Sequence, residues 1–338
     1  MAKALIVVLL ELVSSVMLGR IMIPVFRKIK TGKFDIYVGD RFKQDGSEPS
    51  GGGALILLTL ITGVFAGAAA FEADSDSVRG ILCMMMFVSA LTAVGLAEDY
   101  IREVRGGIGM KSAHRVLIKL TLCLCFTAVM KLCGFESRVI LLPFRWGGID
   151  MGRAYIPLTA VIMTIMITAA EVCDCQRGVH DTGIDVLCCM TMFVGFLGLA
   201  AAFGTGSREA SRLICSCAAA ACGAFEVWGL SPAKLYIGRS GGLLLGGLMC
   251  GIMVLSGMPI AVWLAMAVPL AELVMMGLQW AVFRANKKLL LKGATIHEHL
   301  HNTGMSDSGI FMIFAIAQLL FGIGAAAYAV YETKFFLK

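Results

Sequence analysis

Long apolar runs separated by short polar connections account for most of the chain. A transmembrane helix needs about 20 mainly apolar residues, so ten spans would occupy about 200 positions. We predict spans near Ala4–Phe26, Gly53–Phe71, Gly80–Ala97, Val116–Cys133, Ile156–Val172, Ile184–Phe203, Ala210–Trp228, Gly242–Leu255, Ile260–Val282 and Gly309–Tyr331. The eighth span is short and ends at Ser256–Pro259, which indicates a broken or tilted helix there. The pattern predicts an all-α integral membrane protein with about ten transmembrane helices, in which residues 1–338 form a single polytopic membrane domain.

Composition agrees with this class and excludes an ordinary soluble enzyme. Hydrophobic residues make up 58% of the chain and charged residues 15%, whereas soluble domains carry about 25% charged residues. Ten of the twelve cysteines lie in apolar runs, so we interpret them as small packing residues rather than a disulfide framework. We expect no nucleic acid as a partner.

The basic residues are distributed unequally between alternate loops. Seventeen Lys and Arg residues lie in the odd-numbered loops and five in the even-numbered ones. Because cytoplasmic loops are enriched in Lys and Arg, we predict that the odd loops are cytoplasmic and that both termini lie outside. The fourth loop, with Val139–Leu142 followed by Trp146–Gly148, predicts a small external β-hairpin between helices 4 and 5.

All five histidines also lie in odd loops. Titratable groups gathered on one membrane face indicate a functional site on that face, so we predict a cleft at the cytoplasmic surface. The alternative interpretation is that histidine, like lysine and arginine, simply avoids hydrocarbon.

Six short segments beside the spans differ from ordinary loop sequence. They are Glu48–Gly53, Gly95–Tyr100, Gly109–Arg115, Pro232–Gly242, the pair Glu272 and Gln279, and Ala294–His299 with the Gly304–Asp307 that follows. In this order, with ten spans, the chain resembles the polyprenyl-phosphate sugar-1-phosphate transferases over nearly its whole length. Within that family it is most similar to the phospho-N-acetylmuramoyl-pentapeptide transferases, which form lipid I in peptidoglycan synthesis.

The resemblance implies a multi-pass protein of the bacterial inner (cytoplasmic) membrane. In the family, a polyprenyl phosphate attacks a UDP-linked amino sugar, UMP leaves, and a lipid-linked diphosphate sugar forms. Carboxylates hold a Mg²⁺ there, because two anionic reactants must meet and the metal neutralises charge developing on the leaving phosphate. The implied partners are polyprenyl phosphate, a UDP-linked amino sugar and membrane lipid. A homodimer, or pairing with an intact paralogue, is also expected from the resemblance.

The acidic positions of the family pattern are only partly retained. The family's Asp-Asp pair after the third span corresponds to Glu98 and Asp99, and the Lys that follows corresponds to Arg115. In the seventh loop the family reads Met-Gly-Asp-x-Gly-Ser. The matching segment is Ile237–Gly242, so the Asp position holds Arg239.

The fifth loop departs further from the pattern. Without a gap, Glu171 and Asp174 fall on two family Asn positions, Arg177 on the metal-site Asp, and His180 on the second Asp. A shifted alignment that uses a neighbouring Asp is an alternative for Arg177. No such shift is available for Arg239, since both of its flanks match without a gap.

Positions toward the C-terminus agree better with the family. Glu272 and Gln279 lie seven residues apart on one face of the ninth span, and the three-histidine motif keeps His297 and His299, with Glu298 between them. The resemblance implies that substrate contacts come from Arg115, Glu171, Asp174, Glu272, Gln279, His297, Glu298 and His299.

The substitutions change the charge of the implied catalytic centre. Its five acidic positions become Glu98, Asp99, Arg177, His180 and Arg239, which have a formal charge of zero with neutral histidine. Arginine has no lone pair for a metal and stays protonated. Two guanidiniums facing one small volume would repel a dication by several kcal/mol at an effective dielectric constant of ~20. We predict that the family's Mg²⁺ site is lost, with Asp99 the one weak candidate ligand.

Three functional interpretations follow. The first, which we take as the prediction, is a catalytically impaired paralogue that still binds lipid phosphate or UDP-sugar at the cytoplasmic face. The second is an active transferase in which Arg177 and Arg239 clamp the diphosphate in place of the metal. The third is a non-catalytic membrane scaffold. Whether the chain is an enzyme therefore stays open between these alternatives.

Overall fold

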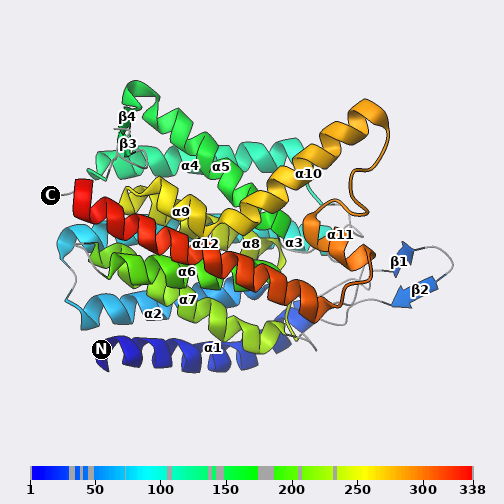
Figure 1. The fold of residues 1–338 in the computed structure, drawn as a ribbon. Helices are drawn as coiled ribbons and strands as arrows, with labels where there is room; N and C mark the ends of the chain where they lie inside the picture. The colour runs from blue at the N-terminus through cyan, green and yellow to red at the C-terminus, as the bar shows by residue number, and fades with distance from the viewer. Residues whose placement is uncertain are drawn as a thin grey trace.

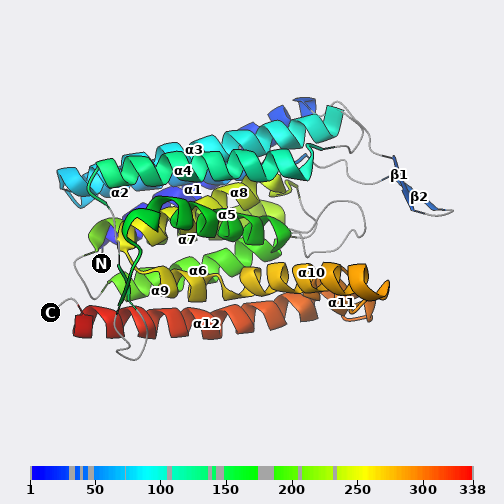
Figure 2. The same cartoon turned by 90° about the horizontal axis from the view of Figure 1, so that it is seen from above.

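Helices arranged side by side in one bundle make up most of the protein (Figures 1 and 2). The computed structural model describes residues 2–29, 35–38, 41–44, 49–72, 74–104, 109–135, 139–141, 148–173, 186–204, 208–230 and 234–336. In chain order the elements are α1 (Ala2–Ile29), β1 (Asp35–Val38), β2 (Arg41–Gln44), α2 (Gly52–Ala70), α3 (Ser75–Val104), α4 (Ser112–Leu132), β3 (Val139–Leu141), β4 (Gly148–Asp150), the 3₁₀ helix η2 (Gly152–Ala154), α5 (Tyr155–Cys173), α6 (Leu187–Phe203), α7 (Glu209–Gly229), α8 (Gly238–Ser256), α9 (Pro259–Ala265), α10 (Ala267–Asn286), α11 (Ile296–Asn302) and α12 (Asp307–Phe336).

Eight of the described helices are long and apolar enough to cross a membrane, namely α1, α2, α3, α5, α7, α8, α10 and α12. The predicted fourth and sixth spans correspond to α4 and α6, which fall outside this set. Helix α6 has 17 residues, about 25 Å of helix against a hydrocarbon core of about 30 Å, and α4 carries Arg115, Lys119 and Lys131. The all-α, multi-pass membrane class is confirmed, whereas the count of ten spans is not reproduced in the described part of the chain.

The predicted ninth span is two helices rather than one. Helix α9 ends at Ala265 and α10 begins at Ala267, with Met266 between them at φ −112° and ψ 17°. The side chain of Gln318, on α12, is completely buried and occupies this break. Its Nε2 donates to the carbonyl of Ala265 at 2.7 Å, and its Oε1 accepts from the N–H of Val268 at 3.3 Å. The backbone groups freed by the break are therefore satisfied inside the protein, as a membrane interior requires.

The eighth span, by contrast, is a continuous helix. Helix α8 runs from Gly238 to Ser256 and so begins earlier than the predicted start at Gly242. The break expected at Ser256–Pro259 is the plain end of one helix and the start of the next, with Pro259 in the first turn of α9. Proline is tolerated there because that position has no N–H partner in the helix. Of the predicted broken or tilted helix, the break is therefore wrong, and the tilt stays a prediction.

Helix α8 lies at the centre of the bundle, where nearly all of its residues are buried. It packs against α3 on one side and α5 on another. Its many glycines leave the space into which side chains of α3 and the backbone of α5 fit, a mode of close helix packing common in membranes. This packing brings the first residues of α8 beside the last turns of α3 and α5.

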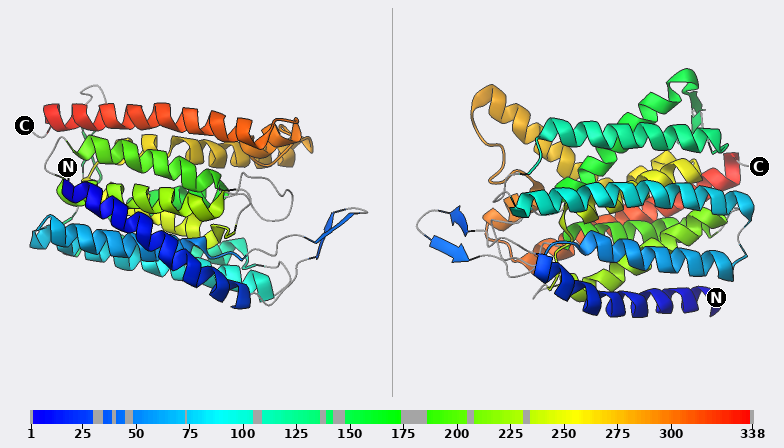
Figure 3. Two further views of the ribbon diagram at one scale, coloured as in Figure 1. Left: turned by 90° about the horizontal axis from the view of Figure 1, so that it is seen from below. Right: turned by 180° about the vertical axis from the view of Figure 1, so that it is seen from behind.

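The start of α1 and the end of α12 lie at the same end of the bundle, opposite the β1–β2 pair and α11 (Figures 1 and 3). The grouping of the basic loops on the opposite side stays a prediction, because loop residues 30–34, 45–48, 105–108 and 174–185 lie outside the described residues. Which of these sides faces the cytoplasm stays a prediction.

Two short antiparallel strand pairs accompany the helices. Strands β1 and β2 pair with Asp35 opposite Gln44, in a segment that we expected to be loop. Between α4 and α5, where the hairpin is predicted, β3 and β4 pair with Val139 opposite Asp150 and Leu141 opposite Gly148. The residues that join β3 to β4, 142–147, lie outside the described residues, and the external position of this pair stays a prediction.

Candidate functional site

Two of the segments singled out in the sequence lie side by side. The N–H groups of Gly51 and Gly52 both donate to the carbonyl of Tyr236, at 3.3 and 2.9 Å. The N–H of Gly53 donates to the carbonyl of Ile237 at 3.1 Å. The N–H of Tyr236 returns a bond to the carbonyl of Pro49 at 3.0 Å. The three glycine N–H groups at the start of α2 therefore bind protein carbonyls and hold the start of α2 against the start of α8.

Asp99, near the end of α3, caps the start of α8. Its Oδ1 accepts the N–H of Arg239 and its Oδ2 accepts the N–H of Ser240, both at 3.2 Å. A carboxylate at a helix N-terminus satisfies unpaired N–H groups and complements the helix dipole. Gly238, just before them, has a φ of +68°, and a Cβ there would meet the Asp99 carboxylate. The turn into α8 and the position of Asp99 therefore require each other.

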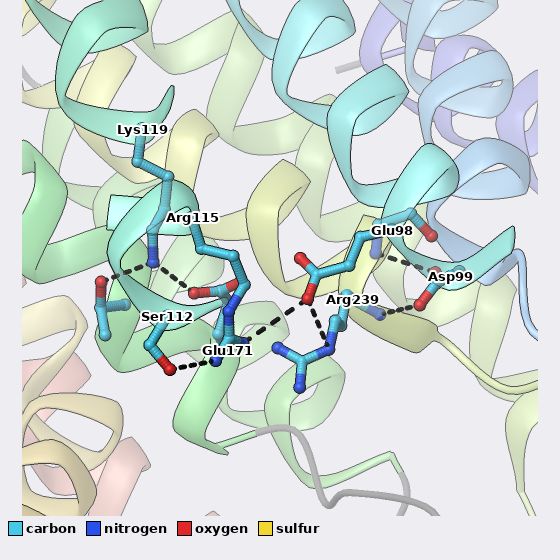
Figure 4. Close-up of polar contacts among 9 residues, drawn as sticks. Glu98, Asp99, Ser112, Arg115, Lys119, Glu171 and Arg239 are labelled. Atoms are coloured by element: carbon cyan, nitrogen blue, oxygen red, sulfur yellow. Dashed lines mark hydrogen bonds and ion pairs between the residues drawn. The ribbon is translucent and has the colours of Figure 1, made fainter. Parts of the chain in front are cut away.

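Glu98, the neighbour of Asp99, lies between two arginines (Figure 4). Its Oε1 is 3.4 Å from the Nε of Arg239 and 3.6 Å from an Nη of Arg115. The Glu98 side chain is only 2% exposed, whereas those of Arg115 and Arg239 are 24% and 15% exposed. The other Nη of Arg115 donates to Ser112 Oγ at 3.1 Å. One buried carboxylate thus holds two guanidiniums that are partly open to solvent.

One helical turn beyond Arg115 along α4, Lys119 forms a second ion pair. Its Nζ lies 2.5 Å from Oε2 of Glu171 and donates to Thr168 Oγ1 at 2.8 Å. Both partners of the ion pair are buried, with 4% and 9% of the side chain exposed. This contact joins α4 to α5 within the bundle and lies beside the Glu98 group in Figure 4.

We call the six residues Glu98, Asp99, Arg115, Lys119, Glu171 and Arg239 the charge cluster. It contains three carboxylates and three cations, so its formal charge is zero. The arrangement is not fully satisfied: Nε of Arg115 is buried without a hydrogen-bond partner in the described structure, and Nε of Arg239 makes its 3.4 Å ion pair with Glu98 outside hydrogen-bond geometry. Buried donors without a partner are uncommon in folded proteins, and an anion with several oxygens would satisfy them.

The described residues do not fit a magnesium site of the family type. Arg239 has no lone pair to offer, both oxygens of Asp99 accept backbone N–H groups, and Glu98 faces two guanidiniums. Within the described part of the chain, no group of three His, Cys, Asp or Glu side chains is placed to hold a metal. The chemistry that this donor set favours is the binding of an anion by arginine.

Glu272 forms the centre of a second polar group, between α10 and α11. Its carboxylate accepts the N–H groups of Ile296 at 2.8 Å and His297 at 3.1 Å, and its Oε1 lies 3.2 Å from Nδ1 of His297. Glu272 is completely buried and His297 is 1% exposed. A carboxylate of α10 therefore caps the first turn of α11 and fixes one of its histidines.

The remaining predicted residues of this region bind backbone groups of the segment that connects α10 to α11. Gln279 accepts the N–H groups of Leu290 and Leu291 and donates to the carbonyl of Leu291, at 3.0–3.1 Å. Glu298 accepts the N–H of Ala294 at 2.6 Å, and Nδ1 of His299 accepts that of Lys292 at 3.1 Å. We call Glu272, Gln279, His297, Glu298 and His299 the α10–α11 clamp.

The structure thus divides the predicted site residues into two groups. Glu98, Asp99, Arg115, Glu171 and Arg239 come together, whereas the clamp residues hold the chain between α10 and α11. Asp174, Arg177 and His180 lie outside the described residues. Lys119 lies in the predicted fourth span, where an ionisable residue is a functional candidate, but the sequence analysis gave it no specific role. Its position four residues after Arg115 places both cations on one face of α4, and this spacing was the available signal.

Comparison with known proteins agrees with this arrangement. The model of glycosyl transferase family 4 matches residues 81–257, a range that includes every member of the charge cluster. Three similar proteins are each named phospho-N-acetylmuramoyl-pentapeptide-transferase. The protein of Clostridioides difficile (strain 630) is 24% identical over 306 residues, 89% of this chain and 90% of its own. That of Halalkalibacterium halodurans is 26% identical over 333 residues, 97% and 98% of the two chains, and that of Bacillus subtilis (strain 168) is 25% identical over 319 residues, 94% of each.

Proposed function

Because the chain belongs to glycosyl transferase family 4, we propose that its charge cluster binds the phosphate groups of a polyprenyl phosphate or a UDP-linked sugar without a divalent metal. The relatives are named for transfer of a phospho-N-acetylmuramoyl-pentapeptide, and the proposal gives this chain the same class of ligand. It functions at the cytoplasmic face of the membrane, in peptidoglycan synthesis, as a divergent member impaired in transfer.

The observation that carries the proposal is the position of Arg239 at the start of α8, directed at Glu98 beside Arg115. Both guanidiniums are partly exposed, and the buried Nε of Arg115 has no hydrogen-bond partner in the described structure. Arginine binds phosphate through charge-assisted, often bidentate hydrogen bonds. Two such side chains, preorganised by one buried carboxylate, support phosphate binding at this point.

The same arrangement opposes metal-dependent transfer. A metal in this family brings two anions together and neutralises the leaving phosphate, and the cluster supplies positive charge from fixed side chains instead. Fixed guanidiniums hold phosphate oxygens and orient them, but they cannot take a phosphate oxygen into a coordination shell. We therefore propose binding as the retained function.

Isothermal titration calorimetry on the purified protein in detergent tests the proposal. UDP-N-acetylmuramoyl-pentapeptide and polyprenyl phosphate are titrated separately, each with Mg²⁺ and with EDTA. We expect equal affinity in both conditions for at least one ligand. Binding that needs Mg²⁺ would contradict the proposal, as would the absence of binding to either ligand, which would leave the scaffold alternative.

A transfer assay separates the impaired protein from the rewired enzyme. With labelled UDP-sugar and polyprenyl phosphate we expect no lipid-linked diphosphate sugar above background, with or without Mg²⁺. Product formed equally well in EDTA would favour the active transferase with an arginine clamp. EDTA-sensitive product at an ordinary enzymatic rate would refute the loss of the metal site.

A charge-reversed variant provides a positive control. The double substitution Arg177→Asp with Arg239→Asp restores acidic residues at two positions where the family has them. We expect this variant to bind the nucleotide sugar only when Mg²⁺ is present, opposite to the unmodified protein. Metal-independent binding by the variant would show that the two arginines do not supply the positive charge.

A further inference from the structure

Two cysteines meet at the end of α3 and α4 that lies far from the charge cluster. The sulfur of Cys83, near the start of α3, is 3.9 Å from the sulfur of Cys133, the residue that ends α4. Both residues are partly exposed, unlike most of the other described cysteines, which are buried. The sequence analysis treated both cysteines as packing residues, and nothing in the chain pattern distinguishes this pair.

The backbone around Cys133 is held by the end of its helix. The N–H of Cys133 donates to the carbonyl of Val129, and the N–H of Phe135 reaches back to Met130, both at 2.9 Å. Gly134, between them, has a φ of +84°, which completes the usual glycine-terminated helix end. Phe135 then packs against α3 at Gly80. The end of α4 is therefore fixed against the first turns of α3, with Cys133 directed at Cys83.

We propose that Cys83 and Cys133 form a reversible disulfide that cross-links α3 to α4. The two sulfurs must approach from contact distance to about 2.05 Å, and the Cα atoms of a disulfide lie about 4.4–6.8 Å apart. We expect rotation of the two side chains about their Cα–Cβ bonds to supply this change, since both residues are partly exposed.

The oxidant is a small or protein disulfide that reacts by thiol–disulfide exchange. The thiolate of one cysteine attacks the oxidant, forms a mixed disulfide and releases one thiol. The second cysteine then attacks the mixed disulfide and releases the other thiol. In total, two protein thiols and one external disulfide give one protein disulfide and two external thiols, so atoms and electrons balance.

The location of the pair agrees with this chemistry. It lies at the end of the bundle where α1 begins and α12 ends, the end that the distribution of basic residues places outside. Thiols on the outer side of a membrane are in an oxidising compartment, whereas cytosolic thiols are kept reduced. The bridge would close a loop of the chain from residue 83 to residue 133. Glu98, Asp99 and Arg115 lie within this loop, at the other end of α3 and α4. The bridge does not depend on the proposed function.

The test uses the full-length protein in native membranes, treated with glutathione disulfide or with dithiothreitol. Accessible thiols are then blocked with N-ethylmaleimide, and the protein is digested and analysed by mass spectrometry. We expect a peptide pair joined through Cys83 and Cys133 after oxidation. In the reduced sample both residues should instead be alkylated, and reduction of the oxidised sample should restore their reactivity.

Three single substitutions complete the experiment. Cys83→Ser and Cys133→Ser should each abolish the linked peptide and leave the remaining partner alkylated. Cys125→Ser removes an exposed cysteine of α4 and is the matched control, which should leave the linkage unchanged. Continued alkylation of both Cys83 and Cys133 after oxidation would overturn the proposal, and so would linkage of either residue to a different cysteine. If a serine variant fails to fold, peptide mapping of the unmodified protein still decides.

Discussion

The charge cluster and the α10–α11 clamp lie at the same end of the bundle, and each contains a buried glutamate with several partners. In the clamp, Glu272 accepts N–H groups of the backbone and touches one histidine. In the cluster, Glu98 faces two arginine side chains. From the resemblance to the family pattern we expect the clamp to keep its glutamate and two of three histidines, and Arg239 in the cluster to stand at an acidic position.

The contrast follows from what each carboxylate binds. Backbone N–H groups are the same whatever the sequence, so a carboxylate that caps a helix and orders a connection is useful in any member of the fold. The cluster is made of side chains that face one another, and substitutions there can compensate for one another in charge. We infer that the clamp serves the scaffold and that the cluster sets which ligand is bound. The predictions below separate the two roles.

The largest effect is expected within the cluster, from the ion pair between Lys119 and Glu171. Glu171→Gln leaves a buried ammonium without its counter-charge, and loss of one partner of a buried pair costs about 3–5 kcal/mol. The free energy of unfolding in mixed micelles should fall by that order. The double variant with Lys119→Met should recover most of the loss, because no buried charge then remains unpaired.

The matched control is Asp76→Asn. Asp76 pairs with Arg79 in the first turns of α3, and their side chains are 71% and 54% exposed. Exposed ion pairs contribute about 0–1 kcal/mol, so this variant should unfold like the unmodified protein. Equal losses for Glu171→Gln and Asp76→Asn would show that the inner pair does not stabilise the bundle.

The next effect concerns the clamp. In Glu272→Gln only one oxygen remains as an acceptor. The NH₂ group that replaces the other oxygen is a donor, so it cannot accept the N–H of Ile296 or His297 that it faces. Loss of hydrogen bonds to a buried charged group costs about 1.5–3 kcal/mol. Limited proteolysis should cut the 287–295 connection faster, while phosphate affinity measured on the intact fraction stays unchanged. A large loss of affinity without faster cleavage would instead assign Glu272 to the ligand.

The third effect belongs to Arg239. Its removal in Arg239→Ala should weaken metal-independent phosphate binding by about one to two decades, since a charge-assisted contact contributes about 1.5–3 kcal/mol. Arg79→Ala is the control, because it removes the same charge from an exposed position on α3. Calorimetry in EDTA at low and high salt measures both variants. Equal losses for the two arginines would indicate a general charge effect and contradict a specific contact.

The smallest effect is expected from Glu98, and it is a gain in phosphate affinity rather than a loss. Glu98 positions Arg115 and Arg239, but its charge also competes with phosphate for them. Glu98→Gln keeps an oxygen acceptor and removes the competing charge, so it should raise phosphate affinity. The gain expected for removing such a competitor is about 0.5–1.5 kcal/mol, roughly twofold to tenfold. The same titration in EDTA measures it. Weaker binding that is restored by Mg²⁺ would identify Glu98 as a metal ligand and remove the distinction between the cluster and the clamp.

The class of the protein and its family could be predicted from the sequence, because each depends on local pattern. A bilayer demands about 20 apolar residues in every span, and runs of that kind are visible without a structure. The motif segments occur in order along the chain, so the flanks of Arg239 alone predict that it occupies a family Asp position. The expected proximity of Glu98, Asp99, Arg115 and Arg239 followed from that placement.

Details that depend on residues far apart in the chain could not be predicted. The sequence placed the irregular helix at Ser256–Pro259, yet the break lies at Met266, where Gln318 of α12 supplies the missing hydrogen bonds. The pairing of Lys119 with Glu171 depends on how α4 meets α5, and the capping of α8 by Asp99 depends on how α3 meets α8. Local sequence determined which segments enter the membrane, because the bilayer acts on each helix separately. The partner of each buried polar group was decided by tertiary packing, since in a low-dielectric interior that group must find whatever donor or acceptor the neighbouring helix presents.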